Sequence, residues 1–212
     1  MLTVPMIIEK VYKGSVLPTI QKSRTLTWMN KHMNGLMCRI IGMKLKKTFG
    51  GCITFYGIGG AKLDPEVEAF LLKAKFPYAI GYGLTETAPL LGYAMHGWRG
   101  VGVMGYPVYN VQLKLHNVNP ETGEGEIIAK GPNVMLGYYK DPARTKSVFT
   151  KDGWFRTSDI AVQDEKGRFY IKGRNSNMIL GPSGENIYPE EIENVLNNVE
   201  GVSESIVVER DG

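Results

Sequence analysis

The hydrophobic pattern divides the chain into a helical first part, a middle part of short strands and a helical end. Residues 5–47 are rich in Met, Ile, Leu and Lys, and their apolar periodicity is interrupted at Gly14, Pro18 and Gly35. Because glycine weakens a helix and proline ends or kinks one, the pattern predicts two or three helices in this region rather than one.

A strand–helix–strand unit is predicted next. Residues 52–56 form an apolar, β-branched and aromatic run between glycines, which is typical of a buried strand. Asp64 is then expected to cap a helix that begins with Pro65 and Glu66. Residues 78–80 form a second buried strand. This order predicts an α/β fold with a partial parallel-sheet lobe and helices.

From about residue 100 the helical periodicity gives way to short alternating runs separated by turns. Residues 111–115 and 126–129 predict one hairpin, and residues 160–162 and 169–171 predict another. Such closely spaced hairpins indicate a small, distorted β-barrel.

The last part of the chain predicts one helix and one strand. Pro189 stands near the start of a short amphipathic helix, and residues 205–208 have the apolar, β-branched character of a strand. The apolar face of the helix consists of Ile192, Val195, Leu196 and Val199. One helix and one strand cannot bury both their faces, so we expect the start of an α+β domain here.

Composition and charge exclude several classes of protein. Among the 212 residues, 43% are hydrophobic and 22% are charged, which allows a globular core. The net charge of +4 is mild and no long basic tract is present, which argues against a nucleic-acid partner. Cys38 and Cys52 lack metal-ligand spacing and are expected to be buried thiols. No signal peptide or membrane-spanning apolar run is seen, so we expect a cytoplasmic protein.

Residues 81–87, Gly-Tyr-Gly-Leu-Thr-Glu-Thr, carry the most informative set of functional groups. The two glycines let a backbone approach a flat ligand, and Tyr82 between them offers an aromatic face. Thr85 adds a hydroxyl, and Glu86 adds a carboxylate of the kind that Mg²⁺ accepts. Together they indicate a nucleoside triphosphate site, although such a loop alone is as often only a tight turn.

Three other short motifs suit the remaining parts of a nucleotide. Asp159, at a predicted strand start, can accept hydrogen bonds from both ribose hydroxyls, although alone it is more typical of a salt bridge. Arg174 follows one hairpin later, so we expect the two side chains at the same end of neighbouring strands. The small residues Gly59, Gly60 and Ala61 leave room for a base.

As a set, these motifs resemble those of the adenylate-forming superfamily. The matching stretches are Gly-Gly-Ala-Lys-Leu-Asp-Pro-Glu, Gly-Tyr-Gly-Leu-Thr-Glu-Thr, Gly-Trp-Phe-Arg-Thr-Ser-Asp, and Gly-Arg followed by Gly-Glu-Asn-Ile-Tyr-Pro-Glu-Glu-Ile-Glu. They cover most of the chain in the superfamily's order and spacing. The opening stretch from Val4 to Tyr12 is similar to the long-chain fatty acyl-CoA synthetase branch.

The resemblance implies an AMP-forming ligase of fatty acid metabolism. A fatty carboxylate attacks the α-phosphate of Mg-ATP, and the CoA thiol then attacks the acyl-adenylate and expels AMP. The residues implied to border the nucleotide are Gly59, Gly60, Ala61, Gly81, Tyr82, Gly83, Thr85, Asp159 and Arg174. Tyr82 would stack on the adenine, and Asp159 and Arg174 would hold the ribose. Thr85, at the α-phosphate, and Glu86, as the Mg²⁺ ligand, are the catalytic candidates.

Two elements of the superfamily are not found in the sequence. No Ser/Thr/Gly-rich phosphate loop with Pro-Lys is present, and Lys166 and Lys172 do not match the context of the superfamily's catalytic lysine. We therefore expect a middle-to-late piece of a longer enzyme that has little synthetase activity alone. The alternatives are a ligase with another acceptor or acid, such as a carrier-protein thiol or an aryl acid, and a non-catalytic nucleotide-binding module.

The resemblance also implies the domain organisation. Residues 1–100 would be part of the large N-terminal α/β domain, residues 101–174 its β-barrel subdomain, and residues 175–212 the start of a C-terminal domain that swings. Ser176 falls at the hinge, where a charged residue is more usual, and Gly184 falls in the loop brought toward the CoA arm. The expected partners are small molecules (fatty acid, ATP and CoA), and contact with the inner face of a membrane stays open.

Overall fold

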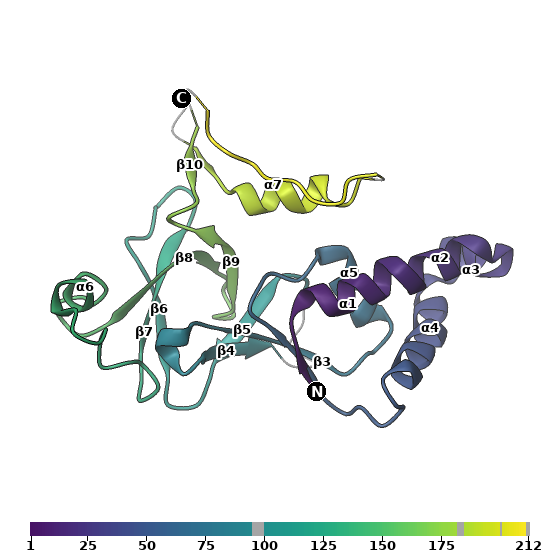
Figure 1. Cartoon of the computed structure of the whole chain (residues 1–212), viewed down its shortest axis with the longest axis horizontal. Coiled ribbons are helices and arrows are strands. Elements are labelled where there is room, and N and C mark those ends of the chain that lie inside the picture. Colours follow the sequence, from purple (N-terminus) through teal and green to yellow (C-terminus); the bar gives the residue numbers. More distant parts are fainter. Residues whose placement is uncertain (95–99, 182–184, 200, 211–212) are drawn as a thin grey trace. The chain divides into compact units, whose positions relative to one another are not determined.

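The computed structural model describes residues 1–94, 100–181, 185–199 and 201–210 (Figure 1). Two compact units make up the chain. The first comprises Met1–Gly83 and Gly92–Gly105, and the second comprises Leu84–Leu91 and Tyr106–Gly212. The predicted nucleotide motifs are thus divided between the two units.

The first unit contains the predicted parallel sheet, in which β1 (Leu2–Thr3), β2 (Tyr56–Gly59) and β3 (Tyr78–Gly83) lie in that order. Strands β4 (Leu90–Ala94) and β5 (Val103–Pro107) come next in the strand order, and each has residues in both units. Strands β1, β2 and β3 run parallel, and α5 (Pro65–Lys73) connects β2 to β3. Asp64 caps α5 as predicted, because its carboxylate accepts the Glu66 N–H at 2.8 Å. The predicted α/β fold class is confirmed.

Three helical segments precede β2: a continuous rod from α1 to α2, then α3, then α4. The breaks between them fall at other positions than the sequence suggests. The helices are α1 (Pro5–Val11), a π-helical turn (Tyr12–Val16), α2 (Leu17–Lys22), α3 (Arg24–His32) and α4 (Asn34–Thr48). Gly14 and Pro18 do not interrupt the rod from α1 to α2, because the wider π turn accommodates the proline; Figure 1 shows this rod beside the sheet of the first unit. The breaks fall instead at Ser23 and Met33.

The rod packs one apolar face into the core of the first unit. Ile8, Tyr12, Val16 and Ile20 recur every four residues along it, and all are buried. The π turn in the middle offsets the drift that a four-residue spacing has on an α-helix, so the side chains stay on one face. The other main members of this core are Met37, Ile41, Leu45, Tyr56, Ile58, Val67, Leu71 and Phe76.

Strand β2 begins later than predicted. It starts at Tyr56 rather than at residue 52, and Phe55 is 46% exposed. The partner strand explains the shift: the Tyr56 N–H bonds to the Pro77 carbonyl, and Pro77 has no N–H with which to extend the ladder. Cys52 is therefore exposed, against the prediction of two buried thiols, whereas Cys38 is buried as expected.

The second unit contains an antiparallel sheet with strand order β6-β7-β8-β9. Its elements are a 3-10 turn (Thr85–Thr87), β6 (Gln112–His116), β7 (Gly125–Lys130), α6 (Pro142–Ser147), β8 (Phe155–Gln163), β9 (Phe169–Arg174), β10 (Ile179–Leu180), β11 (Asn186–Ile187) and α7 (Pro189–Leu196). Both predicted hairpins are confirmed, since β6 pairs with β7 and β8 pairs with β9.

The end of the chain differs from the prediction. Residues 205–208 form no strand, and the Val207 N–H donates to the Glu193 carboxylate at 2.8 Å instead of to a neighbouring strand. Helix α7 forms as predicted, and its apolar residues stay largely exposed, with Val195 at 69%. The domain boundaries at residues 100 and 174 stay a prediction. None of the described helices is long and apolar enough to cross a membrane.

Candidate nucleotide-binding site

Asp159 and Arg174 meet as the sequence predicts. They are directly opposite each other in the β8–β9 ladder, and Arg174 Nε lies 3.3 Å from Asp159 Oδ1. The aspartate side chain is 7% exposed and the arginine side chain 57% exposed, so the carboxylate is held inside and the guanidinium covers it from the solvent side. Asp159 lies inside β8, not at a strand start, because the strand begins earlier, at Phe155.

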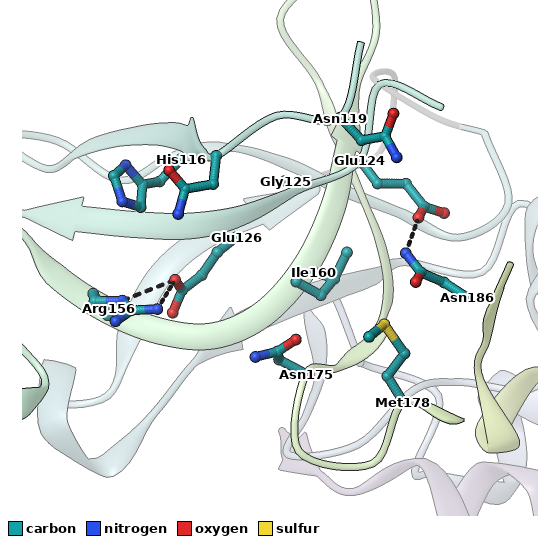
Figure 2. A pocket seen from close by; sticks show the side chains of 11 residues that line it. His116, Asn119, Glu124, Gly125, Glu126, Arg156, Ile160, Asn175, Met178 and Asn186 are labelled. Atoms are coloured by element: carbon teal, nitrogen blue, oxygen red, sulfur yellow. Dashed lines mark hydrogen bonds and ion pairs between the residues drawn. The ribbon is translucent and has the colours of Figure 1, made fainter. Parts of the chain in front are cut away.

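A pocket of about 210 Å³ lies near this pair in the second unit (Figure 2). The side chains around it are mostly polar. They are His116, Asn117, Asn119, Glu124, Glu126, Arg156, Ile160, Asn175, Met178 and Asn186. Figure 2 shows Arg156 paired with Glu126, and Asn186 donating to Glu124. Arg156 and Asn186 come from two of the matching stretches, but none of the residues predicted to contact the nucleotide or Mg²⁺ lines this pocket.

Glu86 lies in a loop that is fastened by polar contacts within the second unit. Its backbone carbonyl accepts the Met135 N–H at 2.8 Å, and the Asn133 amide donates to the carbonyls of Thr87 and Leu90. The Tyr138 hydroxyl donates to Glu86 Oε1 at 3.0 Å. The loop is thus held in place from the segment between β7 and α6.

The surroundings of Tyr138 favour the protonated form of its hydroxyl. Burial, followed by the hydrogen bond to Glu86, raises the pKa of its hydroxyl, and the Arg144 guanidinium lies 4.1 Å from its ring centroid. Asn133 and Tyr138 could not be predicted from the motifs, since neither belongs to one and both act on a loop about fifty residues earlier in the chain.

Thr85 and Glu86 differ in accessibility. Thr85 is exposed at the start of the 3-10 turn, whereas Glu86 is half-buried. Among the described residues no three His, Cys, Asp or Glu side chains form a metal cluster. A single carboxylate nevertheless fits Mg²⁺, which keeps several waters and is commonly held by one or two carboxylates together with substrate phosphates. Glu86 is therefore a suitable ligand for a nucleotide-bound Mg²⁺.

The glycine motifs lie at the carboxyl ends of two adjacent parallel strands in the first unit. Gly59 at the end of β2 pairs with Gly81 in β3, and a Cβ on Gly59 would lie only 3.2 Å from the Gly81 carbonyl oxygen. Gly60 has φ +90°, and Ala61 is exposed. Half-buried Tyr82 and exposed Gly83 end β3. In open α/β sheets ligands bind at this edge.

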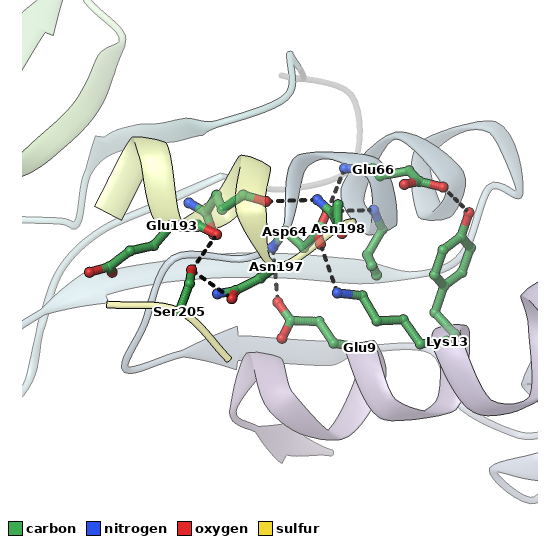
Figure 3. Close-up of polar contacts among 11 residues, drawn as sticks. Glu9, Lys13, Asp64, Glu66, Glu193, Asn197, Asn198 and Ser205 are labelled. Carbon is green, nitrogen blue, oxygen red and sulfur yellow. Dashed lines mark hydrogen bonds and ion pairs between the residues drawn. The ribbon is translucent and has the colours of Figure 1, made fainter. Parts of the chain in front are cut away.

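The segment after Gly60 is tied to α1 and the π turn of the helical rod (Figure 3). Glu9 Oε1 accepts the Asp64 N–H at 2.9 Å, and Lys13 Nζ lies 3.6 Å from Asp64 Oδ2. Tyr12 donates its hydroxyl to Glu66 Oε1 at 3.0 Å. These contacts hold the beginning of α5, and hence the end of the glycine loop, against the helical rod. None of these three residues of the rod was predicted to bind the nucleotide, although Glu9 and Tyr12 belong to the Val4–Tyr12 stretch.

Of the two residues predicted to take part in domain motion, the structure describes Ser176. Ser176 is exposed in the turn after β9, and its hydroxyl donates to Asn177 Oδ1 at 3.0 Å. Gly184 lies outside the described residues. Within each unit, then, the structure brings together Gly59 with Gly81, and Asp159 with Arg174.

Known proteins resemble the chain in both sequence and structure. Residues 1–139 match the family described as AMP-binding enzyme. A 2-succinylbenzoate–CoA ligase from Oceanobacillus iheyensis is 39% identical over 66% of this chain and 30% of that protein. The peroxisomal long chain acyl-CoA synthetase 6 from Arabidopsis thaliana is 38% identical over 74% of this chain and 24% of that protein.

A solved structure is also similar to this chain. It is an O-succinylbenzoate coenzyme A synthetase from Bacillus subtilis in complex with ATP and magnesium ion, 30% identical, with a TM-score of 0.67 over 74% of this chain and 34% of that one. The matched part of the chain spans only 30% and 24% of the length of these two sequence relatives. By the family match over residues 1–139, the chain belongs to the AMP-binding enzyme family.

Proposed function

We propose that this chain forms the nucleotide-binding part of an ATP-dependent acid–thiol ligase. In the proposed reaction a carboxylate oxygen attacks the α-phosphorus of ATP and pyrophosphate leaves. The sulfur of a thiol, CoA in the leading case, then attacks the acyl carbon, and AMP leaves as the thioester forms. The observation that carries the proposal is the Asp159–Arg174 pair, whose ladder register places a buried carboxylate beside an exposed guanidinium.

In this proposal the Asp159 carboxylate accepts hydrogen bonds from the two ribose hydroxyls, and the Arg174 guanidinium donates hydrogen bonds to ribose or phosphate oxygens. Residues at the ends of β2 and β3 contact the adenine in this proposal. Tyr82 stacks on the ring, and the glycines let the edge of the adenine approach the backbone. The residues with this role are Gly59, Gly60, Ala61, Gly81 and Gly83.

Thr85 and Glu86 serve the phosphates. The exposed Thr85 hydroxyl donates to the α-phosphate, where charge develops during attack. Glu86 holds Mg²⁺, which when bound neutralises phosphate charge. Tyr138 keeps one carboxylate oxygen of Glu86 in a fixed direction through its hydrogen bond. Ser176 and residues 175–212 belong to a mobile C-terminal domain in this proposal.

The acid is a long-chain fatty acid in the leading version. The stretch from Val4 to Tyr12 supports it, as does the similarity to an acyl-CoA synthetase from Arabidopsis thaliana. The second candidate is an aryl acid, because a relative named as a 2-succinylbenzoate–CoA ligase is similar to the same degree. Pyrophosphate exchange by the complete gene product, with palmitate or 2-succinylbenzoate as the acid, separates these candidates: the true substrate stimulates exchange and the other does not.

Nucleotide binding is tested on the 212-residue chain by calorimetric titration with AMP. We expect AMP to bind and Asp159→Asn to weaken binding by about tenfold, since hydrogen bonds to a charged acceptor are lost. Asp164→Asn is the matched control, because Asp164 also pairs with an arginine of the same hairpin but lies at the β8–β9 turn. Equal AMP affinity in the wild type and Asp159→Asn would contradict the proposal.

A further inference from the structure

The backbone immediately before Asp159 has an unusual conformation. Ser158 has φ +62°, in the left-handed region that favours glycine. It lies in a bulge of β8: Glu126 pairs with Ile160 and Ile128 pairs with Arg156, so residues 157–159 all lie opposite Ile127. Bulges of this kind redirect side chains, here the side chain of Asp159.

The bulge deprives Ser158 of its normal ladder partner, and a side chain replaces it. Glu126 Oε1 accepts the Ser158 N–H at 3.1 Å. The carbonyl of Ser158 accepts the N–H of Asn175, the residue directly after Arg174, at 2.8 Å. Thr157 Oγ1 donates to the Ile127 carbonyl at 2.8 Å and accepts the Asp159 N–H at 3.1 Å. The backbone from residue 157 to 159 is therefore bonded on both sides.

Arg156 fixes the carboxylate that performs this task. Its Nε and Nη2 lie 2.9 and 2.8 Å from Glu126 Oε2, which leaves Oε1 for Ser158 (Figure 2). The Glu126 side chain is only 8% exposed, and a buried carboxylate is stable only when it is paired. The two side chains act as one unit, with Arg156 orienting Glu126 and Glu126 holding Ser158.

From this geometry we infer that Glu126 and Arg156 are positioning residues for the ribose site. They hold Ser158 in its left-handed conformation and thereby aim the Asp159 carboxylate at the ribose hydroxyls. This inference rests on the proposed function, because it assigns the pair to the same nucleotide site. Neither residue needs to touch the ligand.

The test compares two nucleotides on the 212-residue chain. AMP carries both ribose hydroxyls, and 2′,3′-dideoxy-AMP carries neither, so the ratio of their dissociation constants reports the hydroxyl contacts alone. We expect the wild type to prefer AMP by about tenfold or more. Glu126→Gln presents an amide N–H₂ where Arg156 needs an acceptor, and we expect it to reduce the ratio to about threefold without changing the affinity for the dideoxy compound.

Two further variants keep the test decisive. Arg156→Lys retains the charge but not the paired donors, so we expect a smaller loss of the same ratio even if Glu126→Gln folds poorly. Adding Ser158→Gly to Glu126→Gln should restore part of the ratio, because glycine adopts φ +62° without support. Asp164→Asn, which breaks an arginine pair elsewhere in the same hairpin, should leave the ratio unchanged.

The outcomes distinguish the inference from the proposed function. If the wild type binds AMP no better than the dideoxy compound, the ribose assignment of Asp159 fails and the inference fails with it. If Asp159→Asn abolishes the preference while Glu126→Gln and Arg156→Lys keep it, the positioning role is wrong and the nucleotide site stands. An equal loss of affinity for both compounds in Glu126→Gln would also overturn the positioning role, since it indicates a general structural effect.

Discussion

The two units of the chain hold their functional residues by different physical means. In the first unit the glycine loops end strands β2 and β3, and an apolar core under α1, α4 and α5 fixes those strands. In the second unit the positions of Glu86 and Asp159 depend on hydrogen bonds that involve side chains: Tyr138 donates to Glu86, and Glu126 and Thr157 accept backbone N–H groups of residues 158 and 159. Changes in the first unit should therefore alter stability first, and changes in the second should alter binding first.

The largest effect is expected from a cavity in the first unit. Leu71 on α5 is fully buried, with 0% exposure, and Leu71→Ala should lower the free energy of unfolding by about 2–5 kcal/mol. Met43 on α4 is 62% exposed, so Met43→Ala should change it by less than about 0.5 kcal/mol. Urea unfolding followed by circular dichroism measures both. If Leu71→Ala and Met43→Ala lowered the free energy of unfolding equally, the claim that the apolar core fixes the first unit would be wrong.

Glu86→Gln tests the second unit through function rather than stability. Glutamine keeps the shape of the side chain and can still accept the Tyr138 hydrogen bond, but it is a poor Mg²⁺ ligand. We expect pyrophosphate release by the complete gene product to fall about a hundredfold or more, with little change in the melting temperature. The control is Glu121→Gln, a change at an exposed glutamate in the turn between β6 and β7. Near-normal pyrophosphate release by Glu86→Gln would refute the assigned role.

The same contrast explains how much the sequence could predict. The Asp64 cap, both hairpins and the meeting of Asp159 with Arg174 follow from local pattern and from pairing across one short turn, so they were predictable. The start of β2 was not, because Pro77, directly before the partner strand β3, determines it. A π turn removed the expected breaks at Gly14 and Pro18.

Residues that support the site were harder to find than residues that form it. Glu126 acts on a backbone N–H 32 residues away and Tyr138 on a carboxylate 52 residues away. Neither contact leaves a periodic signal in the sequence, because it depends on which strands become neighbours. Motif matching therefore predicts the groups that are offered to a ligand, whereas their supports become visible only in three dimensions.

Smaller changes in stability are expected at two glycines of the first unit, of which Gly60 needs a glycine conformation and Gly14 does not. Gly60 has φ +90°, so Gly60→Ala should destabilise the fold by about 1–2 kcal/mol and disturb the loop proposed for the adenine. Gly14 lies in the helical rod with no atom within 4 Å of an added Cβ, so Gly14→Ala should stabilise by about 0.5–1 kcal/mol. Urea unfolding gives the sign of each change, and a destabilised Gly14→Ala would show that the π turn itself needs glycine.

The smallest effect concerns alkaline pH and compares one tyrosine from each unit. Burial and the nearby Glu66 carboxylate raise the pKa of Tyr12 above its ordinary value of 10.0, and burial and Glu124 do the same for Tyr188. Each folded unit therefore binds the phenolic proton more tightly than the unfolded chain does. The stability from each hydrogen bond is fully present below about pH 10 and falls by up to about 1.4 kcal/mol per pH unit above it.

Tyr12→Phe and Tyr188→Phe isolate these contributions. Each should lower stability by about 1 kcal/mol near neutral pH, where the hydrogen bond to glutamate is lost. The wild type should then lose its advantage over each variant as the pH rises past about 10, because the phenylalanine variants have no proton to release. Urea unfolding at about pH 8 and about pH 11 measures the change. Parallel pH profiles for the wild type and Tyr12→Phe would mean that the Tyr12–Glu66 bond contributes nothing to the hold of the helical rod on α5, which would leave Glu9, Lys13 and apolar packing to fix the glycine loop of the first unit.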